Sequence, residues 1–178
     1  MTGIAMDSSQ PPKPETDAPP PRREVLDTVA AQVQALDELV GIARRSIRVF
    51  DIDLSQMGWN APVRAEALGA FLRRSPLVRF ECIVHEARHL EAHCPRLTTL
   101  RNRYGHLMSF AITGQQAKHA RDPLVIVDGR HFLHRYDFER PRASLGIEQP
   151  DEAAPLIDRF NEIWETRESN LPGTLLGI

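Results

Sequence analysis

The feature that most constrains the fold is an alternation of two apolar patterns along the chain. Between Leu26 and Ala43, apolar side chains recur every three or four residues, which is the spacing of one face of an α-helix. We expect Asp27 to cap this helix, and Arg44 and Arg45 to lie in its last turn. The next run, SIRVFDID, is rich in β-branched and aromatic residues and predicts a strand.

The same alternation continues to the middle of the chain. In order, we expect a helix opened by Pro62, a strand over 77–84, a helical segment that Pro95 interrupts and Gly105 ends, and a strand over 106–113. Alternating helices and strands indicate a parallel arrangement, because each helix carries the chain back across the sheet.

Two strands and a helix complete the predicted order. PLVIV (123–127) and HFLHRY (131–136) flank Asp128-Gly129, a pair that favours the positive φ angles of a tight hairpin. A final helix starts near Asp151, and its apolar face carries Leu156, Phe160, Ile163 and Trp164. The predicted fold class is therefore α/β: a mixed sheet of about five or six strands with helices on both faces, in the order α-β-α-β-α-β-β-β-α. In such sheets ligands bind beyond the carboxyl ends of the parallel strands, here near Asp51, Asp53 and His85.

The ends of the chain differ in composition. Residues 1–24 contain repeated prolines and offer little for burial, so we predict a disordered tail there and a single domain over 25–178. The length of 178 residues fits one domain. No apolar run is long enough to cross a bilayer, and the first residues lack the apolar core of a signal peptide, so we expect a cytoplasmic protein.

The charge balance excludes one class of partner at the level of the whole chain. Lys and Arg number 22 against 24 Asp and Glu, a net charge of -2, so no global positive field attracts nucleic acid or anionic lipid. The net charge does not exclude a local basic patch. The two cysteines, Cys82 and Cys94, predict no disulfide. We expect no cofactor.

The stretch VHEARHLEAHC contains His85-Glu86-x-x-His89, the spacing found in zinc proteases. Such motifs lie inside a helix, whereas the residues before His85 predict a strand. His93 cannot serve as third ligand, because eight helical residues separate it from His85 by about 12 Å. We therefore expect no metal site and keep a zinc hydrolase built on His85, Glu86 and His89 as an alternative.

Four segments carry a family resemblance: RVFDIDLSQMGWNAP, His93-Cys-Pro-Arg96 with the residues up to Arg103, RDPLVIVDGRHFLHR, and the ending FNEIWETRESNLPGTLLGI. From about Leu26 to Ile178 the sequence resembles a bacterial domain of unknown function with a phospholipase D-like fold. That domain occurs alone or C-terminal to an N-acetyltransferase domain. Single-half members of the wider fold pair into dimers, so the resemblance implies a homodimer.

Catalytic members of the wider fold carry His-x-Lys-x-x-x-x-Asp, followed by Gly-Ser and Asn, and their histidine attacks phosphorus. Matching Asp128 to that aspartate places Arg121 at the histidine and Pro123 at the lysine. The Gly-Ser positions fall near Arg135 and Tyr136. The resemblance therefore implies a degenerate domain, unless His119 and Lys118 replace the missing pair.

Two groups of residues are candidates for binding an anion through charge-assisted hydrogen bonds. The first surrounds the hairpin strands and contains Lys118, His119, Arg121, Asp122, Asp128, His134 and Arg135. The second lies in the helical segment that Pro95 interrupts and contains His93, Arg96, Arg101 and Arg103. For both groups, ordinary ion pairs or an exposed helix face are the competing explanation.

The sequence thus favours a noncatalytic phospholipase D-like domain that binds an anionic small molecule or a protein partner such as an N-acetyltransferase. The alternative is a hydrolase, either a phosphodiesterase that uses His119 or the zinc enzyme described above. Nothing in the sequence indicates a nucleic-acid or membrane partner.

Overall fold

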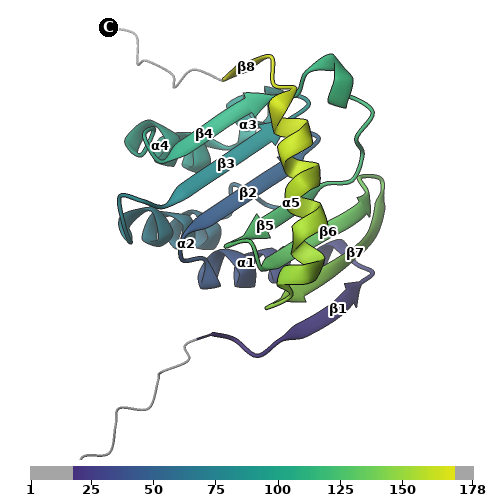
Figure 1. Ribbon diagram of the computed structural model, residues 1–178. Helices are drawn as coiled ribbons and strands as arrows, with labels where there is room; N and C mark the ends of the chain where they lie inside the picture. Colours follow the sequence, from purple (N-terminus) through teal and green to yellow (C-terminus); the bar gives the residue numbers. More distant parts are fainter. Residues whose placement is uncertain (1–17, 171–178) are drawn as a thin grey trace, which may run out of the picture.

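The computed structural model describes residues 18–170, which form one mixed sheet with helices on both faces (Figure 1). The strands are β1 (Arg22–Leu26), β2 (Ser46–Asp51), β3 (Arg79–Val84), β4 (Met108–Ile112), β5 (Leu124–Val127), β6 (His131–Asp137), β7 (Arg140–Ile147) and β8 (Ser169–Asn170). The helices are α1 (Val29–Ile42), α2 (Pro62–Arg73), α3 (Arg88–His93), α4 (Pro95–Arg103) and α5 (Pro150–Glu165), with a 3-10 helix η1 (Gln115–Ala117).

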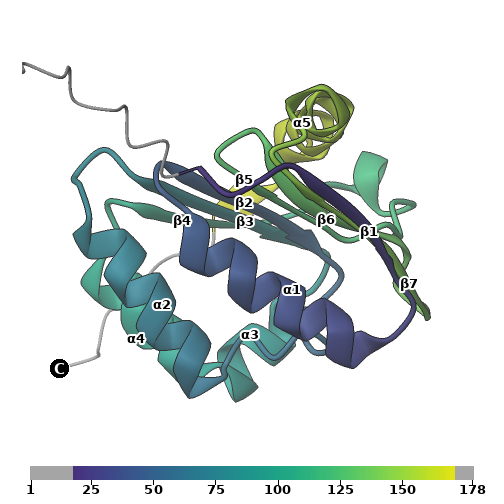
Figure 2. The same ribbon diagram turned by 90° about the horizontal axis from the view of Figure 1, so that it is seen from below.

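The order of strands in the sheet is β1-β7-β6-β5-β2-β3-β4-β8. β2, β3 and β4 are parallel, and the remaining neighbours pair antiparallel. Helices α1, α2, α3 and α4 cover one face and α5 covers the other (Figure 2). The predicted α/β class, with helices on both faces, is confirmed.

Each face of the sheet packs against its own apolar cluster. On the side of α1 to α4, a large core includes Leu36, Leu68 and Phe80, all nearly inaccessible to solvent. On the other side, Phe160 and Ile163 of α5 pack over Phe50 and neighbouring strand residues. Because β2 and β3 are buried on both faces, their sequences are almost continuously apolar.

The β5–β6 hairpin forms as the sequence predicts. Asp128 and Gly129 have φ angles of 54° and 71°, the positive values that this tight turn requires. The carboxylate of Asp128 accepts hydrogen bonds from the backbone N–H groups of Arg44, Arg45 and Ser46 at 2.7–2.8 Å. Asp128 therefore joins the turn to the start of β2. It lies at the edge formed by the amino ends of the parallel strands, opposite their carboxyl ends.

The predicted number of strands is too small, because the sheet has eight. β7 was not expected, since its sequence RPRASLGI contains Pro141 and Gly146, which are uncommon inside strands. Gly146 is needed here because a Cβ at this position would overlap the ring of Phe132. β1 begins at Arg22, inside the predicted tail, and its arginines lie on an edge strand. The tail over 1–17 lies outside the described residues.

The start and end of α1 also differ from the prediction. Its cap is Thr28, whose hydroxyl oxygen accepts a hydrogen bond from the N–H of Ala31 at 3.1 Å, instead of Asp27. The helix ends at Ile42, so Arg44 and Arg45 lie beyond its last turn. Pro95 separates α3 from α4, as expected. Within residues 18–170, no helix combines the length and apolarity needed to cross a membrane.

Candidate functional site

The carboxyl ends of the parallel strands gather several of the predicted site residues. β2, β3 and β4 end at Asp51, Val84 and Ile112, and β5 starts beside them because Leu124 lies opposite Phe50. The segment before β5 and the β6–β7 turn therefore meet at this edge. We refer to it as the carboxyl edge.

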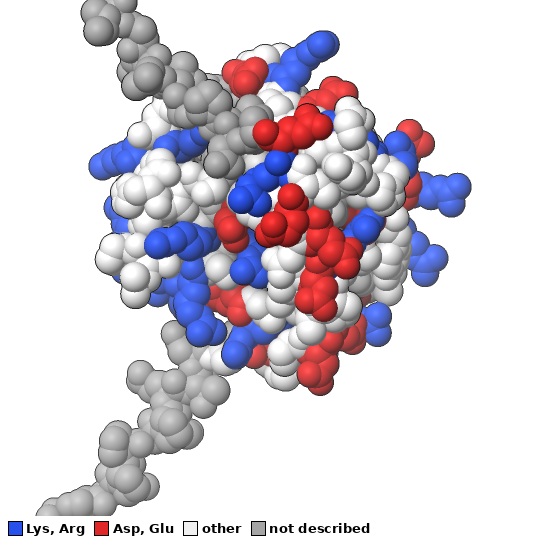
Figure 3. Space-filling model, turned by 45° about the horizontal axis from the view of Figure 1, so that its top comes forward, with Lys and Arg blue, Asp and Glu red and all other residues white. Residues whose placement is uncertain are grey.

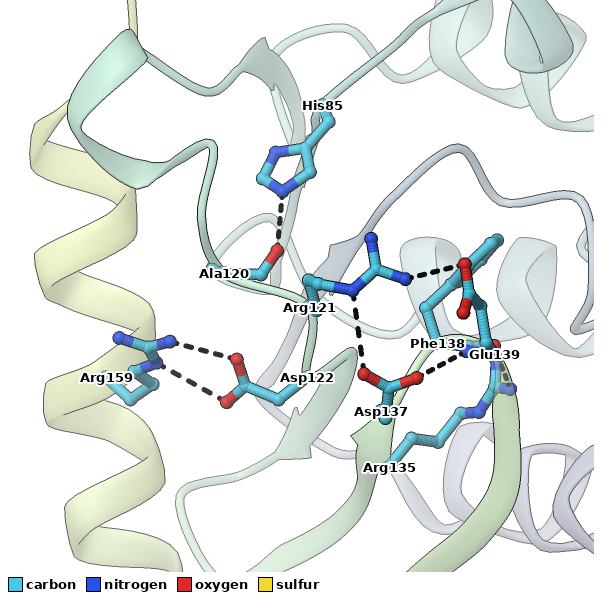
Figure 4. Close-up of polar contacts among 9 residues, drawn as sticks. All are labelled: His85, Ala120, Arg121, Asp122, Arg135, Asp137, Phe138, Glu139 and Arg159. Carbon is cyan, nitrogen blue, oxygen red and sulfur yellow. Dashed lines mark hydrogen bonds and ion pairs between the residues drawn. The ribbon is translucent and has the colours of Figure 1, made fainter.

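His85 follows β3 and is held by two hydrogen bonds. Its Nε2 lies 2.7 Å from the carbonyl oxygen of Ala120, which only accepts, so Nε2 carries the proton (Figure 4). Its Nδ1 lies 2.6 Å from Oγ1 of Thr113. Burial lowers the pKa of His85, which favours the neutral ring, so Nδ1 accepts from the Thr113 hydroxyl. Both ring nitrogens are thus in use.

This geometry opposes the zinc alternative. His85 precedes α3, whereas His89 lies inside it, and the ring of His89 lies 5.0 Å from the ring of His93. In the part of the chain that the structure describes, no three side chains of His, Cys, Asp or Glu are grouped to hold a metal ion. The predicted spacing therefore lies across a strand end and not on one helix face.

Arg121 lies at the position matched to the attacking histidine of the catalytic enzymes. Its Nη2 is 3.0 Å from Glu139 and its Nε is 3.6 Å from Asp137, and both acids belong to the β6–β7 turn (Figure 4). The guanidinium is half-exposed. Two carboxylates therefore compensate the charge that we expected to attract an anion.

Asp122, the next residue, joins this edge to α5. Arg159 donates two hydrogen bonds to its carboxylate, at 2.9 and 3.4 Å (Figure 4). Nε2 of His134 lies 3.5 Å from the same carboxylate. Burial alone would raise the pKa of Asp122, but the hydrogen bonds from His134 and Arg159 outweigh it and hold the pKa well below its usual value. Acids and bases are thus paired here, and binding of an anion by this group of residues stays a prediction.

Arg135 is buried below this layer. Its Nη2 donates to Oε1 of Gln56 at 2.8 Å and to the carbonyl oxygen of Phe138 at 2.9 Å. Its Nε and Nη1, and Nε1 of Trp59, have no partner among the described residues. A cavity of about 10 Å³ lies beside them, lined also by Asp51. Burial raises the pKa of Asp51 to about 6.

His119 and Lys118 do not form the replacement pair. Lys118 Nζ donates to the carbonyl oxygen of His85 at 2.7 Å. His119 is exposed and lines a cavity of about 200 Å³ with Arg159 and Glu162. No carboxylate within residues 18–170 is hydrogen-bonded to its ring, so it lacks the acid that orients a nucleophile.

The structure does not bring the second predicted group together in one of the cavities described in this section. Arg101 is buried with its guanidinium 5.1 Å from the ring centre of Phe110, and Arg103 stacks on Tyr104 at 5.5 Å. Arg96 Nη1 is 3.4 Å from the carbonyl oxygen of Asn60. None of these residues, nor His93, lines any of the three cavities described in this section.

The largest of these cavities lies at the opposite edge and was not predicted. It measures about 380 Å³ and is lined by Ala18, Pro19, Ile42, Arg44, Arg45, Asp128, Arg130, His131 and Glu148. Glu148 has a φ angle of 50°, unusual for this residue, and its carboxylate contacts Arg130 and the buried ring of His131. The Arg44-Arg45 pair before a strand was the available signal, but it was assigned to a helix end.

Sequence reasoning also missed the partners that neutralise the carboxyl edge. Asp137 and Glu139 lie in a turn before a strand that was not expected, and Arg159 lies on the last helix. Only the pairing of their strands and helix brings them to Arg121 and Asp122.

The sheet and its helices define the class: this is a phospholipase D-like fold. It is similar to Nuc from Salmonella typhimurium, a phospholipase D family member, with a TM-score of 0.61 and 15% identity over 85% of this chain and 99% of Nuc. It is also similar to NucT from Helicobacter pylori, with a TM-score of 0.58 and 13% identity over 83% of this chain and 98% of NucT.

The particular family follows from the sequence. Residues 28–171 match the domain of unknown function DUF7931, and the chain belongs to that family. No curated protein matches it. TrmBL2, an archaeal chromatin protein with a novel mode of DNA binding, has a TM-score of 0.62 and 16% identity over 87% of this chain. The chain spans 56% of TrmBL2, and these identities show a shared fold alone.

Proposed function

We propose that this chain is a noncatalytic phospholipase D-like domain that acts by binding an anionic ligand. One observation carries the proposal: Arg121 occupies the position matched to the attacking histidine and is paired with Asp137 and Glu139. A guanidinium cannot attack phosphorus, because its positive charge persists at every physiological pH.

The histidines nearby support the same proposal. The nucleophile of a phosphohistidine mechanism needs a free ring nitrogen beside the phosphate and an acid that orients the ring. His85 has both nitrogens in hydrogen bonds, and its lowered pKa keeps it neutral. The ring of His119 is exposed, but no carboxylate in the described chain forms a hydrogen bond that would orient it.

Arg135 supports the binding role. A buried N–H without an acceptor costs about 1–3 kcal/mol, and Arg135 has two such atoms. The cavity beside these atoms, of about 10 Å³, has room for one water, so an anionic group supplies the missing acceptors only if the neighbouring side chains move apart. Ionised Asp51 opposes this binding, so the affinity for an anion should rise as the pH falls through about 6.

Turnover of bis(p-nitrophenyl) phosphate tests the catalytic half of the proposal. We expect no turnover above buffer, with or without added Zn²⁺. Turnover that His119→Ala or His85→Ala abolishes would overturn it and establish the hydrolase alternative.

Titration calorimetry with inorganic phosphate and with acetate tests the binding half. We expect heat at pH 5.5 that is weaker at pH 8 and is lost in Arg135→Gln, while Arg142→Gln, on an exposed side chain, keeps it. A folded Arg135→Gln protein with unchanged phosphate affinity would remove Arg135 from the site.

Two partners suggested by the resemblance stay predictions. A homodimer is tested by sedimentation equilibrium of the full chain. An N-acetyltransferase partner is tested by co-purification of the full chain with acetyltransferases from the same genome, and no capture at micromolar concentrations would count against it.

A further inference from the structure

The edge opposite the carboxyl edge is built from short helix-to-strand connections. α1 leads to β2 through residues 43–45, α2 leads to β3 through 74–78, and α4 leads to β4 through 104–107. These connections and their flanking positions carry arginines and no Asp or Glu. We call the set Arg45, Arg73, Arg74, Arg79 and Arg103 the arginine edge.

All five side chains of the arginine edge are exposed. Within residues 18–170, none lies within 4.0 Å of a carboxylate. Arg79 donates only to the carbonyl oxygens of Pro76 and Val78. Elsewhere, eight arginines do have a carboxylate within that distance: Arg22, Arg23, Arg48, Arg64, Arg121, Arg130, Arg142 and Arg159. Five exposed arginines without a carboxylate at that distance therefore lie together at this edge, and Arg88, Arg96, Arg140 and Arg167 are further exposed arginines of this kind outside it.

Figure 3 shows Lys and Arg side chains along the left side, where the amino ends of β2, β3 and β4 lie in Figure 1. Further Lys and Arg side chains lie along the right side, and Asp and Glu run through the middle. A chain with a net charge of -2 thus has a cationic edge.

Helix dipoles explain part of this arrangement. Arg73 and Arg103 lie in the last turns of α2 and α4, and Arg74 follows α2 directly, where a cation is stabilised by the helix carbonyls. Arg45 and Arg79 lie outside any helix, at the starts of strands. The helix dipoles therefore account for three of the five arginines.

We propose that the arginine edge binds the phosphate backbone of duplex DNA. Neighbouring strands lie about 4.8 Å apart, so the row from β2 to β4 extends over about 10 Å. One DNA strand presents a phosphate every 3.4 Å or so along the axis, so the row fits about three phosphates of a strand and reaches the strand beside it. A single small anion would use only one or two of the five guanidinium groups.

The surroundings define the mode of binding. No exposed Phe, Tyr or Trp lies among the arginines in the described chain to stack on a base, so contacts fall on phosphates and should not depend on sequence. Leu77, which is 79% exposed, is the large apolar side chain at this edge, too little for insertion into a membrane. The inference goes beyond the proposed function and holds even if the carboxyl edge catalyses.

Fluorescence anisotropy of the full chain with a labelled 30-base-pair duplex of random sequence tests the inference. If five phosphates are contacted, the affinity falls about 500-fold between 50 and 200 mM NaCl. Arg73→Gln/Arg74→Gln should weaken binding at 50 mM NaCl by about tenfold and reduce the salt slope by about two.

The matched control removes the same charge elsewhere. Arg140→Gln/Arg142→Gln changes two exposed arginines of β7, and we expect its affinity to stay within about threefold of the parent. Equal losses in both double variants, or no binding at 50 mM NaCl, would overturn the inference. So would binding to vesicles that contain phosphatidylserine without binding to the duplex. Circular dichroism melting curves confirm that each variant is folded.

Discussion

The two edges of this sheet treat charge in opposite ways. At the carboxyl edge, Arg121 forms ion pairs with Asp137 and Glu139, and Arg159 forms one with Asp122, so carboxylates of the same chain neutralise the positive charge. At the arginine edge, five exposed guanidinium groups have no such acids within the described chain. The likeness of the fold to phospholipase D directs attention to the carboxyl edge, whereas five exposed arginines without a carboxylate partner in the described chain lie at the opposite edge.

The difference follows from the lengths of the connections. The chain leaves the carboxyl ends of β2 and β4 in segments of ten or more residues, which have room for acids, turns and η1. At the other edge each connection has three to five residues. Short connections supply no carboxylates of their own, and the side chains of Arg45 and Arg74 have no carboxylate partner among residues 18–170.

Asp51→Asn should give the largest effect and sharpens the account of the carboxyl edge. Burial raises the pKa of Asp51 from 3.8 to about 6, so the folded state holds the proton more tightly than the unfolded state. Ionised Asp51 therefore destabilises the fold by about 3 kcal/mol above pH 6, and this cost disappears as the pH falls towards 3.8. The variant should gain up to that amount at pH 8.

Urea denaturation at pH 8 and pH 4 measures the difference. We expect the gain at pH 8 to shrink at pH 4, where the Asp51 of the parent is protonated. A gain that is equal at both values, or a loss at pH 8, would contradict the conclusion that burial of the Asp51 carboxylate outweighs its hydrogen bond from Ile52 N–H.

Asp122→Asn should have the opposite sign. Hydrogen bonds from His134 and Arg159 hold the pKa of Asp122 below its unfolded value of about 3.8, so its contribution is fully present above that pH and is lost in more acidic solution. We expect a loss of about 2 kcal/mol at pH 7. Asp158→Asn is the control, because Asp158 is exposed on α5, the helix that carries Arg159; it should change stability by less than about 0.5 kcal/mol.

The pH dependence separates this result from a loss of packing. The deficit of Asp122→Asn should narrow below pH 4 as the parent loses its ion pair. A deficit that stays constant between pH 7 and pH 3 would show that Asp122 does not act through its charge.

The sequence predicted the layers of the fold better than their edges. The 3.6-residue period of α1 and the apolar runs of β2 and β3 are local patterns set by burial, and they were identified correctly. β7 contains Pro141 and Gly146 and acts as a strand only because β1 and β6 pair with it on both sides. Such a strand has no local signal to find.

The candidate site was predicted only in part, because charge pairing is a property of the assembled sheet. The region near Asp51 and His85 was identified from the rule that ligands bind beyond parallel strands. The neutralising partners of Arg121 come from a turn 16 and 18 residues later in the sequence. Arg64 makes the same point: it is fully buried against Asp37 and the carbonyl oxygen of Val33, which no spacing rule indicates.

The double variant Arg73→Gln/Arg74→Gln should change the stability of the fold least, and the size of this change tests the comparison between the two edges. Unpaired guanidinium groups repel one another, so removing two of them at 20 mM NaCl offsets the lost helix-dipole interaction and leaves stability within about 0.5 kcal/mol. Arg121→Gln removes a paired charge and should lose about 0.5 kcal/mol at the same salt. Both differences should vanish at 500 mM NaCl, because salt screens exposed charges. Melting temperatures at the two salt concentrations give the comparison, and a clear low-salt loss for Arg73→Gln/Arg74→Gln would mean that the arginine edge has carboxylate partners in solution.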